Sequence, residues 1–280
     1  MPALSKIALL TILVWSSILF FAYRDLNNEN LQVYFLGVGQ GDATLIITPE
    51  KQKILIDGGP YNNVLSKLGE LLPFHDKQID LLILTHPHAD HLDGLVEVLK
   101  RYEAKNVLLA PVFYTSATYE EFLGTIRKQA ITLVSAEHET DFQFGDNLII
   151  DILFPFEKVD AMEFENLNNA SITLKLTYGE NVLLFTGDAE KELENILLGT
   201  EQELEADYLQ AGHHGSKTAN GLEFLRKVSP DLVVISAGAD NKFGHPHKET
   251  LDKLEDLEIT YLSTQNGNVS LECDLSSCWQ

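Results

Sequence analysis

The sequence contains very little cysteine. Its 280 residues include only Cys273 and Cys278, and neither belongs to a Cys-x-x-Cys pair of the kind that binds zinc. A metal site built from cysteines is therefore excluded. The two thiols can close a short disulfide, which would agree with an oxidising compartment, or remain free near the C-terminus. The sequence leaves both alternatives open.

Basic residues are also scarce. Lysine and arginine number 20 against 42 aspartates and glutamates, which gives a formal net charge of −22. A field of this sign repels phosphate polyanions and disfavours tight non-specific binding of nucleic acid. Bound divalent cations would reverse the sign locally, so a substrate that contains phosphate is still compatible. The glutamates of the downstream half, including Glu190, Glu192 and Glu194, are expected to form a solvated acidic surface.

The chain from residue 31 to residue 280 lacks low-complexity and long Pro/Gly/Ser segments. Because 45% of all residues are hydrophobic, this part can bury a large core, and it is predicted to form one domain. Residues 26–30 (LNNEN) form a polar linker in front of it.

Residues 1–25 predict a membrane anchor. The segment 7–23 is uncharged, lies between Lys6 and Arg24, and would be about 26 Å long as a helix. It ends in bulky aromatic residues and lacks the small-x-small pattern that signal peptidase prefers. We expect an uncleaved transmembrane helix and an extracytoplasmic domain. The alternatives are a cleaved signal peptide, which would give a secreted protein, and a buried soluble helix.

Strand-like and helix-like patterns alternate along the domain, which is typical of an α/β fold. Strands are expected at 31–36, 43–48, 53–56, 79–84, 148–153, 171–177, 181–186, 205–209, 231–236 and 259–262. Helices are expected at about 62–72, 92–101, 118–130, 189–198, 219–228 and 248–256. The segments 41–58 and 170–188 share a strand, hairpin and strand that ends in aspartate. This similarity suggests two facing sheets, with Asp57 and Asp188 at corresponding strand ends.

The densest group of metal-ligating side chains is His86-Pro87-His88-Ala89-Asp90-His91, which follows the apolar run 79–84. Imidazole and carboxylate groups suit Zn²⁺, Mn²⁺ or iron. Four ligands on one short turn point in different directions and cannot all enclose one tetrahedral ion. We therefore expect two neighbouring metals, one at His86 and His88 and the other at Asp90 and His91.

Each of these two metals needs ligands from elsewhere in the chain. Asp188 follows an expected strand and could bridge both ions, although it could also cap the helix 189–198. His213 and His214 follow the next strand between glycines, and His245 lies in a later Gly-His-Pro loop. For these three histidines a solvent-exposed loop is the alternative interpretation.

The motifs, taken in order, resemble a known family. His86–His91 resembles the HxHxDH signature of the metallo-β-lactamase fold. The accompanying motifs are Val38-Gly39-Gln40-Gly41-Asp42-Ala43, Ile56-Asp57-Gly58-Gly59, Thr186-Gly187-Asp188, Gly212-His213-His214-Gly215-Ser216 and Gly244-His245-Pro246. Their succession over 31–270 is similar to the extracytoplasmic hydrolase domain of ComEC-like competence proteins and its free-standing relatives. The resemblance implies an αββα sandwich of two facing mixed sheets with helices outside.

The resemblance also implies roles for individual residues. Two divalent ions, Zn or Mn, would be bound by His86 and His88 on one side and by Asp90, His91 and one histidine of the pair His213-His214 on the other, with Asp188 bridging. Of this pair we choose His214 as the ligand, and His213 would then point toward the substrate or support a ligand. Residues expected to support these ligands or to contact substrate are Asp57, Asp42, Asn169 and Ser171. The segment Asn168-Asn169-Ala170-Ser171 lies where the wider fold carries a third histidine, with asparagine in its place, and only His138 occurs between the HxHxDH motif and Asp188. The first metal is therefore expected to be held less tightly.

The implied chemistry is hydrolysis, in which a water between two cations loses a proton near neutral pH and attacks as hydroxide. Asp90, His213 and His245 are expected to take part, and one of the two histidines would supply the proton to the leaving group. A phosphodiester, either single-stranded DNA or a small wall or lipid headgroup diester, is the expected substrate. The alternatives are lactam or thioester hydrolysis and a membrane-tethered binding module without catalysis.

Overall fold

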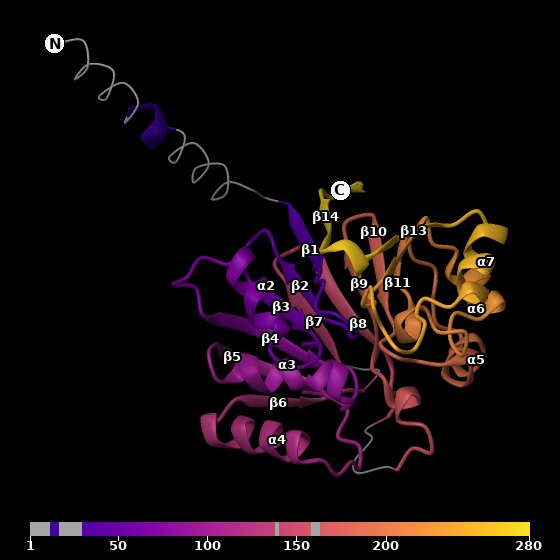
Figure 1. Cartoon of the computed structure of the whole chain (residues 1–280), viewed down its shortest axis with the longest axis horizontal. Coiled ribbons are helices and arrows are strands. Elements are labelled where there is room, and N and C mark those ends of the chain that lie inside the picture. Colours follow the sequence, from indigo (N-terminus) through magenta and orange to yellow (C-terminus); the bar gives the residue numbers. More distant parts are fainter. Residues whose placement is uncertain (1–11, 17–29, 138–139, 158–162) are drawn as a thin grey trace.

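The computed structural model describes residues 12–16, 30–137, 140–157 and 163–280 (Figure 1). Two β-sheets face each other, and helices lie on the outside (Figure 1). Within the described ranges, no helix is long and apolar enough to cross a membrane. The helix expected over 7–23 lies outside the described residues except for 12–16, which are helical.

The first sheet has eight described strands in the order β15-β14-β1-β2-β3-β4-β5-β6. Their bounds are β1 (Leu31–Phe35), β2 (Thr44–Ile47), β3 (Lys53–Ile56), β4 (Gln78–Leu84), β5 (Glu103–Leu109), β6 (Thr132–Ser135), β14 (Val269–Cys273) and β15 (Cys278–Trp279). Strands β1 to β3 pair antiparallel, whereas β3 to β6 pair in parallel.

The second sheet has seven described strands in the order β13-β12-β11-β10-β9-β8-β7. Their bounds are β7 (Asp141–Phe144), β8 (Leu148–Phe154), β9 (Thr173–Tyr178), β10 (Asn181–Phe185), β11 (Tyr208–Gln210), β12 (Leu232–Ile235) and β13 (Thr260–Ser263). The hairpin β9-β10 is followed by parallel β11, as β2-β3 is followed by parallel β4. Asp57 directly after β3 and Asp188 shortly after β10 therefore occupy corresponding strand ends, as the internal similarity predicted.

Helices cover the outer face of each sheet. The first sheet carries α2 (Asn63–Leu71), α3 (Ala89–Leu99) and α4 (Ala117–Gln129), and the second carries α5 (Lys191–Leu198), α6 (Leu222–Val228) and α7 (Lys248–Asp256) (Figure 1). Three 3₁₀ turns, η1 (Leu167–Ala170), η2 (Gly212–Gly215) and η3 (Thr264–Asn266), complete the described elements.

The alternation of side chains along the strands produces this four-layer arrangement. In β3, Ile54 and Ile56 pack between the two sheets, whereas Leu55 packs against the helices. The rings of Phe35 and Phe185, one from each sheet, stack with centroids 6.1 Å apart. The predicted αββα sandwich of two mixed sheets is therefore confirmed.

The strands β5, β6, β7, β14 and β15 were not predicted from the sequence. The first half of β5 carries Glu103 and Lys105, and its buried residues begin only at Val107, so the apolar pattern is too short to indicate a strand. Helix α3 begins at Ala89, three residues earlier than expected, so Asp90 and His91 lie in its first turn. The sequence pattern placed both residues on a loop because their polar side chains face the site.

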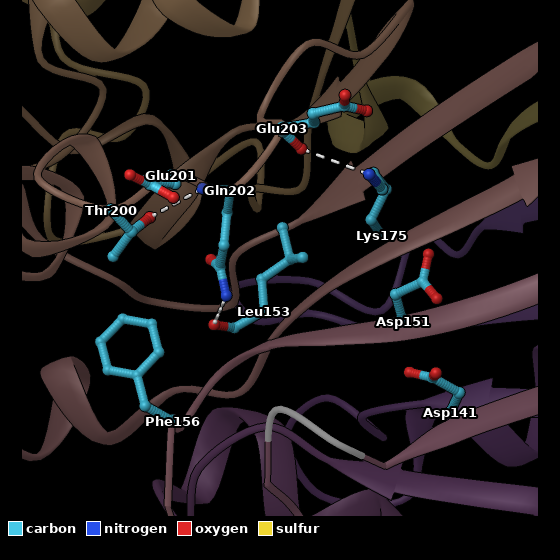
Figure 2. Close-up of a pocket in the computed structure, with 9 residues that line it drawn as sticks. All are labelled: Asp141, Asp151, Leu153, Phe156, Lys175, Thr200, Glu201, Gln202 and Glu203. Atoms are coloured by element: carbon cyan, nitrogen blue, oxygen red, sulfur yellow. Dashed lines mark hydrogen bonds between the residues drawn. The ribbon is translucent and has the colours of Figure 1, made fainter.

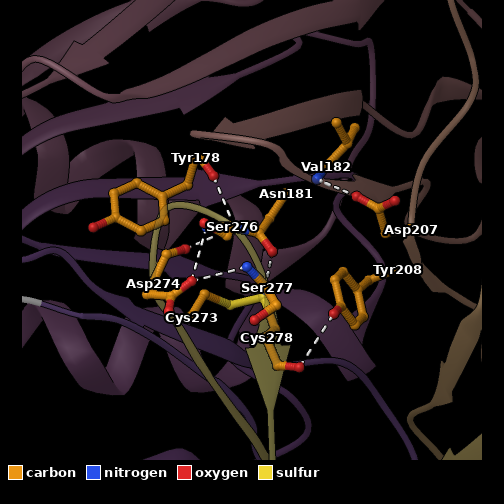
Figure 3. Close-up of a disulfide and its surroundings, with 10 residues drawn as sticks. All are labelled: Tyr178, Asn181, Val182, Asp207, Tyr208, Cys273, Asp274, Ser276, Ser277 and Cys278. Atoms are coloured by element: carbon orange, nitrogen blue, oxygen red, sulfur yellow. Dashed lines mark hydrogen bonds between the residues drawn. A yellow bond between two sulfur atoms is a disulfide. The ribbon is translucent and has the colours of Figure 1, made fainter.

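A disulfide joins Cys273 in β14 to Cys278 in β15 (Figure 3). Between them, the carboxylate of Asp274 accepts hydrogen bonds from the backbone N–H groups of Ser276 at 2.8 Å and Ser277 at 2.9 Å (Figure 3). Asn181 Nδ2 donates to the carbonyl of Asp274 at 2.7 Å and ties this turn to β10. The disulfide alternative is therefore the one that the structure contains.

Replacing both cysteines by alanine is expected to lower the free energy of unfolding by about 2 kcal/mol, because the bond closes a short loop in the unfolded chain. Urea unfolding of the oxidised protein, the reduced protein and the Cys273→Ala/Cys278→Ala variant measures this. Dithiothreitol should lower the midpoint of the wild type and leave that of the variant unchanged. Equal midpoints for oxidised and reduced wild type would contradict a stabilising disulfide.

Candidate metal centre

The six residues predicted to bind metal come together where strands of both sheets end. His86 and His88 follow β4, and Asp90 and His91 lie in the first turn of α3. Asp188 follows β10, and His214 lies in η2 after β11. Helix α5 begins only at Lys191, with Glu190 at its N-cap, so Asp188 is not the helix cap that the sequence allowed.

The ligand-type atoms form two groups that share Asp188. One group contains His86, His88 and Asp188, and the other contains Asp90, His91, Asp188 and His214; within each, the atoms lie within 4.8 Å of one another. Asp188 Oδ2 lies 3.7 Å from His86 Nε2, whereas Asp188 Oδ1 lies 3.2 Å from His91 Nε2 and 3.5 Å from His214 Nε2. Each carboxylate oxygen of Asp188 thus faces a different group.

Several of these atoms are buried without a hydrogen bond. Among the described residues, His91 Nε2, His214 Nε2 and Asp188 Oδ1 have no hydrogen-bond partner although their side chains are almost fully buried. A folded protein rarely leaves converging buried polar atoms unsatisfied, because each costs about 1–3 kcal/mol. Their convergence, and the imidazole and carboxylate donors, fit a divalent cation of the Zn²⁺ or Mn²⁺ type.

Asp57 fixes the orientation of His91 from behind. Its carboxylate accepts hydrogen bonds from the backbone N–H of Thr85 at 2.8 Å and from Thr85 Oγ1 at 2.6 Å, and lies 2.7 Å from His91 Nδ1. Burial raises the pKa of Asp57, and the adjacent His91 partly offsets this effect. With Nδ1 engaged, Nε2 of His91 is directed at Asp188.

Asp42 performs the same task for His214. Its Oδ1 lies 3.1 Å from His214 Nδ1, which also lies 3.0 Å from the carbonyl oxygen of Ser236. Asp42 reaches this place because the loop before it approaches the HxHxDH turn very closely. Gly41 has a φ of 144°, and a Cβ there would lie 2.2 Å from the carbonyl oxygen of Asp90. Only glycine fits that position.

The turn that carries His214 has an unusual backbone. His213 and His214 have φ values of 48° and 56°, in the left-handed region that non-glycine residues rarely adopt. Asn220 holds this turn, since its Oδ1 accepts from Gly212 N at 3.0 Å and its Nδ2 donates to Gly212 O at 2.9 Å. Glu194 in turn accepts hydrogen bonds from the backbone N–H groups of Asn220 and Gly221.

The other paired histidine, His213, lies on the side of His86. Its Nε2 is 3.8 Å from Asp188 Oδ2, and its Nδ1 is 3.1 Å from Glu190 Oε1. Glu190 also accepts a hydrogen bond from Asn168 Nδ2 at 3.1 Å. A carboxylate on Nδ1 fixes the orientation of the ring.

The prediction of a solvated acidic surface is therefore wrong for Glu190 and Glu194. Glu190 contacts His213 in the centre, and Glu194 is only 2% exposed beneath the histidine turn. Both carboxylates serve as hydrogen-bond acceptors within the fold. Composition alone could not distinguish them from solvated neighbours such as Glu192, because burial depends on where α5 packs.

Asn169 and Ser171 also lie beside the centre. Asn169 uses both amide atoms on the acidic segment, accepting from Glu190 N at 3.0 Å and donating to Glu192 Oε2 at 2.9 Å. Ser171 Oγ lies 3.3 Å from His86 Nδ1 and accepts a hydrogen bond from Asp188 N at 3.0 Å. Ser171 thus links the ring of His86 to the backbone of Asp188. His138 lies outside the described residues.

His245 approaches from the loop before α7. Its ring centroid is 5.4 Å from that of His213, and its Nδ1 is 3.2 Å from Gln40 Nε2. Gln40 Oε1 accepts from Gly238 N, so its amide nitrogen is the atom that donates to His245 Nδ1. Burial, together with positive charge on His214 and His213, lowers the pKa of His245 to about 4. The neutral ring then carries its proton on Nε2.

Charges inside the centre compensate one another. Burial holds the pKa of His86 well below its usual range. Burial has the same tendency at His91 and His214, but the carboxylates of Asp188, Asp57 and Asp42 outweigh it and raise both pKa values well above the usual range. A cation that binds here displaces those protons, so metal affinity is expected to increase with pH.

Sequence reasoning missed several supporting residues, among them Thr85, Glu190, Asn220 and Ser236. Thr85 directly precedes His86 and Glu190 follows Asp188 by two residues, and this proximity to predicted motifs is the one available signal for them. Asn220 and the carbonyl of Ser236 act through backbone contacts that only the folded topology brings into range.

A surface pocket of about 550 Å³ lies away from the metal centre (Figure 2). It is lined by Asp141, Asp151, Leu153, Phe156, Lys175 and the segment 200–203. Within it, Lys175 Nζ donates to the carbonyl oxygen of Glu203 at 3.3 Å, and Gln202 Nε2 donates to that of Leu153 at 3.0 Å (Figure 2). None of its residues is a predicted ligand, so the pocket is separate from the metal centre.

An αββα sandwich with two adjoining His/Asp groups at its strand ends defines a class of dinuclear metal-binding proteins. The family model of the Metallo-beta-lactamase superfamily matches residues 36–239, and the chain belongs to this superfamily.

Curated relatives confirm the resemblance to competence proteins. The chain is 32% identical to ComE operon protein 3 of Bacillus subtilis over 90% of its length, and 30% identical to Recombination protein 2 of Haemophilus influenzae over 87%. It spans only 34% and 28% of those two proteins. The solved metallo-beta-lactamase fold protein YhfI from Bacillus subtilis superposes with a TM-score of 0.58 at 15% identity, covering 87% of this chain and 100% of YhfI. That similarity supports the fold alone.

Replacing Asp57 by asparagine is expected to weaken metal binding by about 10–100-fold, because His91 Nδ1 loses its carboxylate partner. Competition with a chromogenic chelator measures the affinity, and circular dichroism checks the fold. Asp80→Asn is the matched control, since Asp80 is a buried aspartate of β4 that accepts a hydrogen bond from Lys53 N in β3 and lies outside both ligand groups. Unchanged affinity in a folded Asp57→Asn protein would contradict this role.

Stability is expected to depend on Glu194. Burial raises its pKa to about 7 from 4.5, against the opposing hydrogen bonds from Gly221 and Asn220. The folded chain then keeps a proton that the unfolded chain releases, so the free energy of unfolding decreases between pH 4.5 and 7, by roughly 3 kcal/mol at most. Urea unfolding across this range should show a smaller decrease in Glu194→Gln. The exposed Glu223→Gln should behave as wild type, and identical pH slopes in all three would refute the assignment.

Proposed function

We propose that this protein is a phosphodiesterase that uses two divalent cations, Zn or Mn. The observation that carries the proposal is the placement of Asp188, whose two oxygens face two separate groups of ligand atoms. Such a shared carboxylate is suited to hold two ions side by side, an arrangement that fits in-line displacement at phosphorus.

The proposed ligands are His86, His88 and Asp188 for one ion, and Asp90, His91, Asp188 and His214 for the other. When bound, the two ions would activate water and neutralise charge on the phosphoryl group. Asp57 and Asp42 hold His91 and His214 in the orientation that binding requires. Their buried carboxylates also offset the positive charge that two cations bring into the fold.

Two histidines are proposed to act on the substrate. His213, with Glu190 on Nδ1, can hold a proton at Nε2 and donate it to the leaving oxygen. His245 is neutral, with Gln40 on Nδ1, and its Nε2–H can donate a hydrogen bond to a phosphoryl oxygen. In this proposal His213, and not His245, supplies the proton to the leaving group. Asp90 would take part as a ligand of the second ion.

Single-stranded DNA or a small diester is the proposed substrate class. The names of the two curated relatives, a ComE operon protein and a recombination protein, favour a nucleic acid. The net charge of −22 opposes a long polyanion track and favours a short contact with few phosphates.

We also propose that the domain is anchored to a membrane through residues 7–23 and faces an oxidising compartment. The support is the uncharged apolar segment of the sequence and the disulfide between Cys273 and Cys278. The protein is expected to remain in the membrane fraction after carbonate washing. Its domain is expected to be digested by protease added outside the cell. Release into the medium would instead indicate a secreted protein.

Purified protein is expected to hydrolyse bis-p-nitrophenyl phosphate when Mn²⁺ or Zn²⁺ is supplied. Asp188→Asn and His88→Ala should lower kcat/KM by roughly 10³-fold or more, because they remove metal ligands whose ions stabilise the transition state by several kcal/mol. The exposed His75→Ala should retain wild-type activity. Hydrolysis of a lactam or thioester without any diester cleavage would refute the proposed substrate, and metal binding without hydrolysis of any ester would indicate a binding module.

A further inference from the structure

A cavity of about 690 Å³ adjoins the metal centre at Asp90. Its walls come from the turn before α2, the first turns of α3 and the loop between β12 and α7. The lining side chains that matter here are Asp90, Asp93, Tyr61, Asp240, Lys242 and Phe243. The volume suits a group of nucleotide size, since pockets for small ligands measure about 300–1,000 Å³.

Two aromatic rings on its walls are exposed to solvent. Tyr61 is 74% exposed and Phe243 is 51% exposed, which is unusual for rings that border a buried centre. The ring of Phe243 lies nearly parallel to that of His245, with centroids 5.7 Å apart and an angle of 21°. Lys242 Nζ lies 5.1 Å from the centroid of the Phe243 ring. One wall of the cavity thus extends from the His245 ring through the Phe243 ring to the ammonium group of Lys242.

The backbone holds both rings in place. Tyr61 has a φ of 55°, a left-handed conformation that costs about 1 kcal/mol or more for such a residue. The carboxylate of Asp93 accepts a hydrogen bond from the backbone N–H of Tyr61. On the other wall, Asn241 Oδ1 accepts from Phe243 N at 3.1 Å and from His245 N at 2.9 Å. These hydrogen bonds constrain the backbone segments that carry Tyr61 and Phe243.

The charge of the cavity selects against polyanions. Among the described residues that line it, Lys242 is the only cation, whereas Asp90, Asp93 and Asp240 are acidic. A neighbouring hollow of about 460 Å³ shares Tyr61 and Asp93 and continues to further carboxylates, including Glu97 and Glu121. Carboxylates repel a chain of phosphates but accept hydrogen bonds from the N–H groups of a neutral heterocycle.

We propose that this cavity binds the nucleobase of the nucleotide whose phosphate lies at the metal centre. Phe243 and Tyr61 provide the stacking surfaces, and Lys242 contacts one flanking phosphate. The proposal rests on the proposed phosphodiesterase function and narrows its substrate to nucleotides with an unpaired base. The acidic continuation at Glu97 and Glu121 would repel the phosphates of further nucleotides.

Two esters with the same leaving group test the proposal, namely thymidine 5′-(p-nitrophenyl phosphate) and methyl p-nitrophenyl phosphate. Phe243→Ala should lower kcat/KM about tenfold or more for the nucleoside ester, the effect of losing one base–aromatic stack, and less than about twofold for the methyl ester. Phe243→Trp should restore kcat/KM for the nucleoside ester. Phe74→Ala, which removes an aromatic ring that is 87% exposed outside the cavity, is the matched control.

An equal loss on both esters would mean that Phe243 acts by supporting His245, and would overturn the proposal. No loss on either ester would overturn it as well, while leaving the phosphodiesterase function intact.

Binding can be measured without turnover. A single-stranded oligonucleotide carrying one 2-aminopurine should lose fluorescence on binding to the wild type, and Phe243→Ala and Tyr61→Ala should reduce this quenching whereas Phe74→Ala should not. If about one or two phosphates are contacted, log K should fall against log salt with a slope of about −0.7 to −1.4. Quenching without diester hydrolysis would reject the phosphodiesterase function and retain the base site. A slope steeper than about −4, with unchanged quenching in both variants, would show a backbone track and contradict the proposal.

Discussion

The carboxylate of Asp188 sits between histidines of two groups, and the rest of the centre is arranged around it. It is nearly fully buried, and burial alone would keep it protonated. The histidines around it, His214 and His91 above all, reverse this tendency and hold the pKa of Asp188 well below its usual range. A buried anion of this kind is stable only with positive charge on both sides, whether from protons or from metal ions.

The fold places this anion by bringing strand ends together from opposite sheets. The hairpin β2-β3 and the strand β4 position Asp57 and the HxHxDH turn, whereas β9-β10 and β11 position Asp188 and His214. Closely approaching glycines and left-handed residues then aim the side chains. The backbone of Gly41 touches Asp90, and the turn at 213–214 is braced by Asn220. Three non-glycine residues of the centre, Asp57, His213 and His214, have left-handed backbones that the surrounding packing supports.

Much of this was predictable from sequence because the ligand types occur in dense motifs. The facing sheets and the corresponding ends at Asp57 and Asp188 follow from apolar runs that stop at polar clusters. The αββα sandwich and the complete ligand groups were implied by the resemblance to the metallo-β-lactamase fold. The polar strand β5, the burial of Glu194 and the contact between Glu190 and His213 could not be predicted. Each of these depends on long-range packing, which residue type and spacing do not encode locally.

The proposed function requires two cations that share Asp188. Metal titration of the metal-free protein tests this requirement most directly. Calorimetry with Mn²⁺ or Zn²⁺ should find two ions per chain with unequal affinities. The weaker one is expected at His86 and His88, where three ligand residues converge among the described residues, against four in the other group. His88→Ala should abolish only the weaker event, and Asp188→Asn should weaken both. A single ion per chain would contradict the proposal that Asp188 is shared by two ions. An Asp188→Asn protein that loses one binding event and keeps the affinity of the other unchanged would contradict it as well.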